Sequence, residues 1–202
     1  MDKVLYYVHD PMCSWCWGFR QVWQQVQEKF PATITVRYLL GGLAADSDQP
    51  MPIALQKSIR ATWQRIEQRI PGTQFNDDFW TKCQPRRSTY PSCRAVVAAK
   101  EQNPAAEKPM ILAIQQAYYL QAKNPSDEAV LIECAKEVGL NTDIFAEALN
   151  SATTKQQLLA ELKFARSIRA NSFPSLILEE AGKCRPLVFD YNDPEVLLRQ
   201  LT

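Results

Sequence analysis

Residues 13–16 read Cys13-Ser14-Trp15-Cys16, and the sequence on either side of these two thiols decides the fold. Upstream, residues 4–8 are apolar or aromatic without polar alternation, which predicts a central parallel strand buried on both faces. Downstream, apolar residues recur at three- and four-residue steps as far as Pro31 and predict a helix of about four turns lying on a sheet. Cys13 then falls at the N-terminus of this helix.

This position has a chemical consequence for Cys13. The unpaired N–H groups of a first helical turn, together with the helix dipole, favour a thiolate over a thiol. Cys16 follows one turn later, close enough to close a disulfide without much backbone movement. We therefore expect Cys13 to be the attacking thiol and Cys16 the resolving one.

Composition narrows the class of protein. The 202 residues are 46% hydrophobic and 22% charged, enough for one substantial core, and 23 basic residues nearly balance 22 acidic ones, so no nucleic-acid partner is expected. The first apolar run is five residues long, and no run approaches the ~18 residues of a membrane span. These features predict a cytoplasmic protein without a membrane partner. In that reducing compartment a CxxC pair is more typical of catalysis than of a structural disulfide.

The order of predicted elements gives the organisation of the chain. Apolar and polar residues alternate over 33–40, and this pattern stops at Gly41-Gly42, which predicts a strand near a sheet edge. This strand completes a βαβ unit. Residues 43–153 carry helix signals and predict an inserted helical subdomain between two parts of a thioredoxin-like domain, 1–42 and 154–202.

The last part of the chain predicts an αββα half. Thr154 is expected to cap a helix that ends at Asn171, and strands are expected at 174–178 and 186–189, joined through Ala181-Gly182. The helix residues expected to face inward are Leu158, Leu159, Leu162, Phe164 and Ile168. The predicted fold class is therefore α/β, a thioredoxin-like fold with a helical insertion between its βαβ and αββα halves.

Three features together resemble the DsbA-like thioredoxin family, most closely its FrnE-like, protein-disulfide-isomerase branch. They are the run Asp10-Pro11-Met12-Cys13-Ser14-Trp15-Cys16-Trp17-Gly18, the place of the insertion, and Ser172-Phe173-Pro174. The resemblance implies that Pro174 is a cis-proline facing the thiols and that Phe173 binds substrate through its backbone. Independently of the family, proline permits a cis bond at a cost of only ~0.5–1 kcal/mol and removes an N–H that would face the thiols.

Two departures from the family pattern bear on the chemistry. Many thioredoxin-like enzymes carry a buried carboxylate six residues before the attacking cysteine, where this chain has Tyr7. The proton acceptor for Cys16 is thus open, with His9 and Asp10 as neighbouring candidates, although a histidine at a strand end is also typical of a structural group. No imidazole lies between the cysteines, so a reduction potential in the middle of the family range is expected.

The remaining cysteines and aromatic residues leave alternatives. Cys93, at a predicted helix start, is either a third thiol near Cys13 or a buried residue on an apolar face. Trp15 and Tyr90 are candidates for an apolar substrate groove, whereas Trp17 is expected chiefly to pack the first helix against the insertion. The sequence has no second CxxC or histidine pair to complete a zinc site, so no metal is predicted.

These features favour a thiol-disulfide oxidoreductase or isomerase acting on a disulfide-containing protein or a small thiol, with no cofactor unless glutathione serves as co-substrate. One alternative is a glutathione-dependent transferase or isomerase of the kappa-class or 2-hydroxychromene-2-carboxylate isomerase type. According to the family resemblance, those enzymes have a serine in place of the attacking cysteine. This chain has Cys13 at that position and also retains Cys16, which argues against them. A further alternative is a non-catalytic module that binds a partner, which a buried Cys13 inert to alkylation would support.

Overall fold

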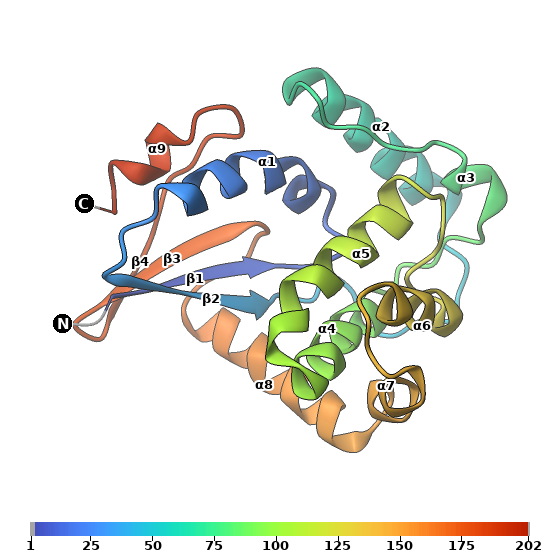
Figure 1. The fold of residues 1–202 in the computed structure, drawn as a ribbon. Coiled ribbons are helices and arrows are strands. Elements are labelled where there is room, and N and C mark those ends of the chain that lie inside the picture. The colour runs from blue at the N-terminus through green and yellow to red at the C-terminus, as the bar shows by residue number, and fades with distance from the viewer. Residues whose placement is uncertain (1–2, 202) are drawn as a thin grey trace.

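The computed structural model describes residues 3–201. A four-stranded sheet in the order β2-β1-β3-β4 forms its centre, with β1 at Lys3–His9, β2 at Ile34–Leu40, β3 at Ser175–Glu180 and β4 at Lys183–Pro186 (Figure 1). Strand β1 pairs in parallel with β2 and antiparallel with β3, so it is central but parallel on one side only. The edge position predicted for the second strand is confirmed.

Both faces of β1 are buried because its side chains alternate between two layers. Leu5 and Tyr7 pack beneath α1 (Ser14–Glu28) and α9 (Glu195–Leu198). Tyr6 and Val8 pack on the opposite face, against α8 (Ala152–Ser167) (Figure 1). A strand between two helical layers has no solvated face, which is why its sequence shows no polar alternation. The thioredoxin-like fold class is confirmed.

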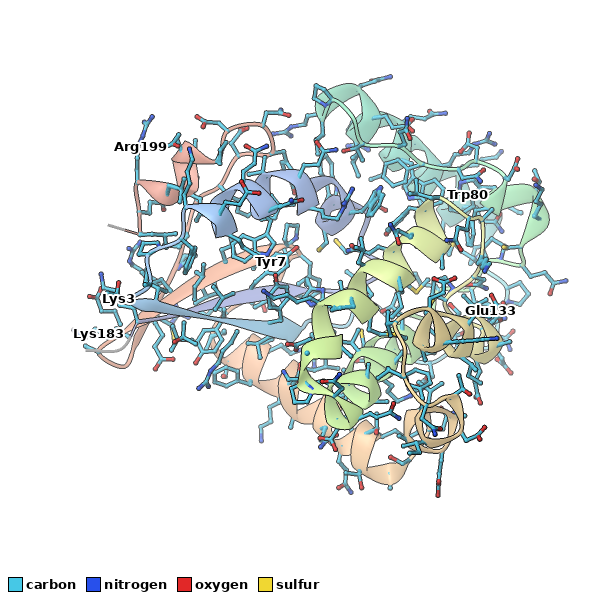
Figure 2. All side chains as sticks on the ribbon, viewed as in Figure 1. Lys3, Tyr7, Trp80, Glu133, Lys183 and Arg199 are labelled. Atoms are coloured by element: carbon cyan, nitrogen blue, oxygen red, sulfur yellow. The ribbon has the colours of Figure 1, made fainter. Side chains whose placement is uncertain are left out.

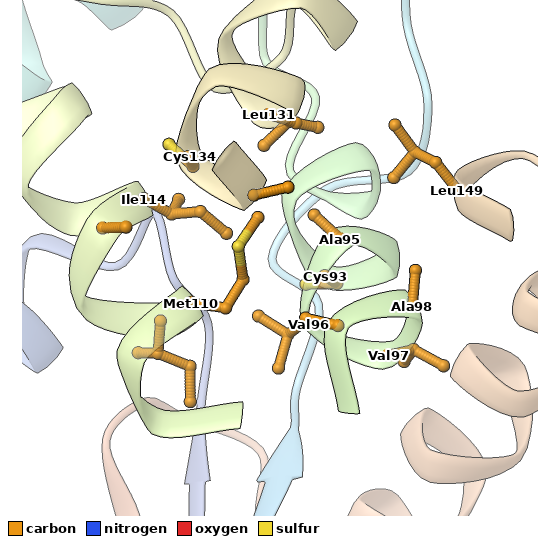
Figure 3. Packing of buried hydrophobic residues seen from close by; sticks show 14 of the residues in the cluster. Cys93, Ala95, Val96, Val97, Ala98, Met110, Ile114, Leu131, Cys134 and Leu149 are labelled. Carbon is orange, nitrogen blue, oxygen red and sulfur yellow. The ribbon is translucent and has the colours of Figure 1, made fainter. Parts of the chain in front are cut away.

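Between β2 and α8 the described chain is helical. Its elements are α2 (Ile53–Arg69), α3 (Phe79–Lys82), α4 (Tyr90–Gln102), the short 3-10 helix η1 (Pro104–Ala106), α5 (Glu107–Tyr119), α6 (Glu128–Glu137) and α7 (Thr142–Leu149). Helices α4 to α7 share a core with α8, in which Met110, Val96 and Leu131 meet (Figure 3). No helix among residues 3–201 has the length and apolar character needed to cross a bilayer. Division of the chain at residues 43 and 153 stays a prediction.

Two details of the C-terminal half differ from prediction in α8. Ser151, not Thr154, caps this helix, because its hydroxyl accepts the Thr154 N–H at 3.1 Å. The buried positions are Thr154, Leu158, Leu162 and Ala165, spaced by four, four and three residues. Leu159 lies about 100° away from that stripe and is 57% exposed, so it does not face inward as expected. Phe164 is 39% exposed, and its ring packs edge-on against Tyr6 of the sheet at 5.2 Å.

The hairpin also differs from prediction in its second strand. The turn at Ala181-Gly182 is confirmed, and both residues have positive φ, 51° and 74°. A two-residue turn requires its flanking residues to pair, so Glu180 lies opposite Lys183 and the strand ends at Pro186. Of the apolar run 186–189, only Pro186 therefore belongs to β4, and residues 187–189 follow it. Its residues Leu187 and Phe189 pack beside the α1 layer instead.

Candidate active site

Cys13 is the N-cap residue of α1, with extended backbone angles of −83° and 113°. Its Sγ accepts the Cys16 N–H at 3.3 Å, as a serine or aspartate oxygen does at an ordinary N-cap. The same sulfur lies 3.4 Å from the Phe173 carbonyl oxygen, 160 residues away in the chain. The peptide bond between Phe173 and Pro174 is cis. The structure thus brings together the Cys13 thiol, the helix N-terminus and the Phe173-Pro174 loop.

Cys16 is more deeply placed than Cys13. The two residues are 1% and 5% exposed, and both sulfurs are free thiols. Burial raises the pKa of the Cys16 thiol well above its usual range, and its interaction with Cys13 adds to that effect. Cys16 is therefore protonated until a base or water removes its proton. A non-catalytic module would have a Cys13 that is both buried and inert to alkylation. Cys13 is buried, and an alkylation experiment tests whether it is inert.

A groove with a cavity of about 500 Å³ lies beside the Phe173-Pro174 loop and includes Trp15 in its lining. The Trp15 ring packs at 5.1 Å from Tyr191, and the Arg69 guanidinium lies 5.8 Å and 5.5 Å from these two rings. Arg169 lines the same groove. A groove with aromatic walls and two guanidinium groups suits an extended peptide or a small thiol that carries carboxylates.

Sequence reasoning missed Arg69, Arg169 and Tyr191 as groove residues. They come from the end of α2, from the turn after α8 and from the segment after β4, so no local spacing connects them with the CxxC pair. It also missed Trp63, whose Nε1 donates to the Ser14 hydroxyl at 2.9 Å and so holds the first turn of α1 against α2.

Asp10 connects the dithiol loop to the helical segment. Its carboxylate is fully buried and accepts the N–H groups of Met12 and Leu43 at 2.8 and 2.7 Å and the Thr89 hydroxyl at 2.6 Å. Burial raises the pKa of Asp10, and these hydrogen bonds oppose that rise. The fourth donor is the Cys93 thiol at 3.6 Å.

Cys93 is 0% exposed, and burial followed by the Asp10 charge raises its pKa well above the usual range. Its hydrogen bond goes to a carboxylate and not to either active-site sulfur. Tyr90 lies apart from the groove: it lines a different cavity with Arg94 and Leu158. Tyr90, a candidate for the groove, is thus not among the residues that line the groove beside Trp15, because it packs in the core shared by α4 and α8.

His9 is 1% exposed, and neither ring nitrogen has a hydrogen-bond partner among the described residues. Its ring stacks on Tyr7 at 5.3 Å, and burial lowers its pKa to about 3. Such a ring stays neutral and forms no hydrogen bond to Cys16. Trp17 has the packing role expected of it, stacking on Tyr119 at 5.5 Å and donating its Nε1 proton to the Gln74 carbonyl oxygen at 3.0 Å.

Comparison with known proteins agrees with this geometry. A family model described as thioredoxin matches residues 6–186. A candidate protein disulfide isomerase from Nitrosomonas europaea is 28% identical, with a TM-score of 0.85 over 100% of this chain and 96% of that one. The cytosolic disulfide reductase DsbM from Pseudomonas aeruginosa is 27% identical, with a TM-score of 0.74 over 92% of this chain and 89% of that one.

Curated relatives carry a different name. The ClpXP adapter protein SpxH of Bacillus subtilis (strain 168) is 25% identical over 204 residues, 98% of this chain and 67% of that protein. The chain spans between 57% and 67% of the length of three adapter proteins of this name. The thioredoxin match covers most of the sequence, and the similar structure from Nitrosomonas europaea aligns over the whole chain. The chain belongs to the DsbA-like thioredoxin family.

Proposed function

We propose that the protein is a thiol-disulfide oxidoreductase in which Cys13 and Cys16 exchange a disulfide with a substrate. The observation that carries this proposal is the position of the Cys13 sulfur, which accepts the Cys16 N–H at 3.3 Å and lies 3.4 Å from the Phe173 carbonyl oxygen. The first contact stabilises a thiolate, and the second places it beside a backbone edge where an extended substrate can pair.

The exchange follows from this geometry in two steps. The Cys13 thiolate attacks one sulfur of the substrate disulfide, forms a mixed disulfide and releases the other sulfur as a thiolate. Cys16 then loses its proton and attacks the Cys13 sulfur, which forms the Cys13–Cys16 disulfide and releases the second substrate thiol. Run in reverse, the same steps oxidise a dithiol. Trp15, Phe173 and Pro174 are the substrate-contacting residues of this proposal.

The groove supports a substrate class for the same reaction. Arg69 and Arg169 are its two cationic side chains, and carboxylates bind guanidinium groups through paired charge-assisted hydrogen bonds. Glutathione, a small thiol with two carboxylates, fits this description as a co-substrate, as does an acidic peptide. A cytoplasmic location is part of the proposal and is supported by the cytosolic disulfide reductase with the same fold.

The test compares the wild type with Cys16→Ser and Cys13→Ser in a glutathione-coupled insulin reduction assay, with adducts identified by mass spectrometry. The Cys16→Ser variant should accumulate a mixed disulfide at Cys13 and lose turnover, and Cys13→Ser should be inactive without an adduct. Wild-type activity in both variants would discard thiol exchange. Glutathione conjugation or isomerisation that survives Cys16→Ser would favour the transferase alternative.

A second candidate function is that of an adapter which binds a protein partner, as the curated relatives are named. The low exposure of Cys13 favours it, since a residue that is 5% exposed offers little surface to a large substrate. Purified ClpX, tested for binding to the wild type and to a Cys13→Ser, Cys16→Ser double variant, separates the two functions. Tight binding that is indifferent to both cysteines, combined with no alkylation of Cys13 in the native protein, would support the adapter and not the enzyme.

A further inference from the structure

A second cavity, of about 190 Å³, lies between α1 and α5, and we call it the α1–α5 cleft. It is separate from the substrate groove, since the two cavities have no lining residue in common. Tyr7 and Tyr38 form its floor: they lie opposite each other on β1 and β2, and their rings meet edge to face at 5.2 Å. Figure 2 shows Tyr7 between α1 and the sheet.

Each wall of the cleft is one face of a helix. In both helices the lining positions recur at three- and four-residue steps: residues 16, 20, 24 and 27 of α1, and residues 108, 111, 112 and 115 of α5. The cleft is thus part of the packing of the CxxC helix against the helical segment.

The cleft has an exposed outer end and a buried inner end. At the outer end the Tyr38 hydroxyl donates to Gln27 at 3.2 Å, and the exposed Lys108 has its ammonium 5.2 Å from the Tyr38 ring. Cys16 lies about three turns before Gln27 in α1, and Gln115 lies about two turns after Lys108 in α5. Both are buried, so the inner end of the cleft is closed and is lined by the Cys16 thiol.

The charged side chains of the cleft are all cationic. Arg20 and Lys108 line it, and the described lining contains no carboxylate. Neither cation has an ion-pair partner within residues 3–201, and Glu107, next to Lys108 in the chain, pairs with Lys100 at 2.7 Å instead. The Arg20 guanidinium lies 4.4 Å from the Trp17 ring, and its buried Nε has no hydrogen-bond partner in that part of the chain. Two cations in one cleft without a carboxylate attract an anionic ligand.

Gln115 is an independent sign of a ligand at the inner end. It is 4% exposed, yet its side-chain amide has no hydrogen bond to another described residue. A buried amide ordinarily finds partners for its two N–H donors and its oxygen in protein, water or ligand. Ile111 and Leu112, one turn earlier in α5, make the wall between Gln115 and Lys108 apolar.

We propose that the α1–α5 cleft binds a small organic acid, with a carboxylate at Arg20 and Lys108 and a second polar group at the Gln115 amide. Guanidinium and ammonium groups bind carboxylates through charge-assisted hydrogen bonds, and the apolar wall suits carbon atoms better than an inorganic anion. The volume is below the ~300–1,000 Å³ of sites for drug-sized ligands, so the acid is compact. Thiol exchange as proposed above does not use this site, although the bound acid lies beside Cys16.

Isothermal titration calorimetry with succinate, a short acid with a carboxylate at each end, tests the site. The guanidinium groups of the substrate groove also suit carboxylates, so the titration uses an Arg69→Gln, Arg169→Gln background at constant ionic strength. One succinate should bind per chain. Succinamide, which has a similar shape and no charge, should bind about tenfold more weakly or not at all.

Variants of the cleft locate the bound succinate. In the same background, Arg20→Gln should weaken binding by about tenfold or more and Gln115→Leu by about fivefold, because each removes a hydrogen-bonding group from one end of the ligand. Lys108→Gln, at an exposed position, should weaken it by about threefold and serves as the second cation variant if Arg20→Gln does not fold. The matched controls are Arg60→Gln, which removes one positive charge from a half-exposed position, and Gln116→Leu, the next position of α5, which lines neither cavity. Both should bind succinate as the background does.

Succinate binding that is absent from the background, or that survives both Arg20→Gln and Gln115→Leu, would overturn this inference and leave the cleft as a space for water. Tighter binding of sulfate than of succinate would also overturn it, since the ligand would then be an inorganic anion. Thiol exchange at Cys13 is measured separately, so none of these outcomes decides the proposed function.

Discussion

Asp10 and His9 are adjacent residues at the end of β1, both fully buried, and they differ in how their polar atoms are satisfied. Asp10 receives four hydrogen bonds from the dithiol loop, the chain after β2 and α4. His9 receives none from the described residues and is held by aromatic rings. The first residue therefore organises the site as a hydrogen-bond acceptor, and the second fills space as a neutral ring.

We expect Asp10→Asn to lower the free energy of unfolding by about 3 kcal/mol, because an amide NH₂ would replace one oxygen that now faces only donors. Urea unfolding followed by circular dichroism measures the change. Asp77→Asn is the control: Asp77 is half exposed and paired with Arg60 at 2.9 Å, and its loss should cost less than about 1 kcal/mol. Equal effects of the two substitutions would contradict the organising role of Asp10.

His9 predicts a dependence of stability on pH. Burial lowers its pKa to about 3 in the folded protein, whereas an unfolded chain has the ordinary value of about 6.5. Between these values the unfolded state binds one more proton. The free energy of unfolding therefore falls as pH is lowered through this window, by up to about 1.4 kcal/mol per unit from this residue.

The variant His9→Phe removes that titration and retains a ring for stacking on Tyr7. Its unfolding free energy should exceed that of the wild type increasingly as pH falls from 6.5 toward 4, with little difference at pH 8. Parallel curves for the two proteins over this range would show that His9 is charged or hydrogen-bonded in the folded state.

At the scale of elements, the end of β2 supports the loop that faces the thiols. Gly41 follows the last residue of β2, and its N–H donates to the His9 carbonyl oxygen at 2.7 Å. A Cβ at this position would overlap the Phe173 ring, which has no flexible end to move aside. Gly41 therefore allows the end of β2 to pack closely against the Phe173-Pro174 loop.

Gly41→Ala should displace Phe173 and reduce the rate of thiol exchange more than it reduces stability. Exchange kinetics and unfolding measured on the same variant give this comparison. Gly18→Ala is the matched control within α1, because the atom its Cβ meets at 2.7 Å is the terminal methyl of Ile70, which can rotate away. It should retain exchange activity. If the Gly41→Ala variant exchanged thiols at the wild-type rate, the close packing of Phe173 against residue 41 would not be required for exchange.

At the scale of the whole molecule, the helical segment and the sheet share one helix. Leu162 of α8 belongs to the core of α4 to α7, whereas Ala165 on the next turn packs against the sheet with Tyr6 and Val8. The aromatic cluster around Trp17, Trp63 and Tyr119 joins the CxxC helix to α2 and α5 in addition. Packing that is continuous in this way predicts one cooperative unfolding transition.

Leu131→Ala tests that cooperativity from a distance, since Leu131 is fully buried in the α4 to α7 core (Figure 3). It should lower the free energy of unfolding by about 3 kcal/mol, and circular dichroism and the alkylation of Cys13 should report the same urea midpoint. Leu159→Ala, at a 57% exposed position of α8, should change stability by less than about 0.5 kcal/mol. Separate midpoints for the two probes would mean that residues 43–153 unfold on their own.

The sequence alone determined the features that depend on neighbours within about one helical turn or one strand pair. These are the dithiol at the start of α1, the doubly buried β1, the edge strand β2 and the Ala181-Gly182 turn, all of which follow from periodicity, caps and turn residues. Tertiary structure alone decided which side of α8 is buried, that Tyr90 leaves the groove, and that Arg69, Arg169 and Tyr191 enter it. The physical reason is separation along the chain: the Asp10–Thr89 and Cys13–Phe173 contacts join residues 79 and 160 positions apart, and only the packing of the sheet and helices brings such residues together.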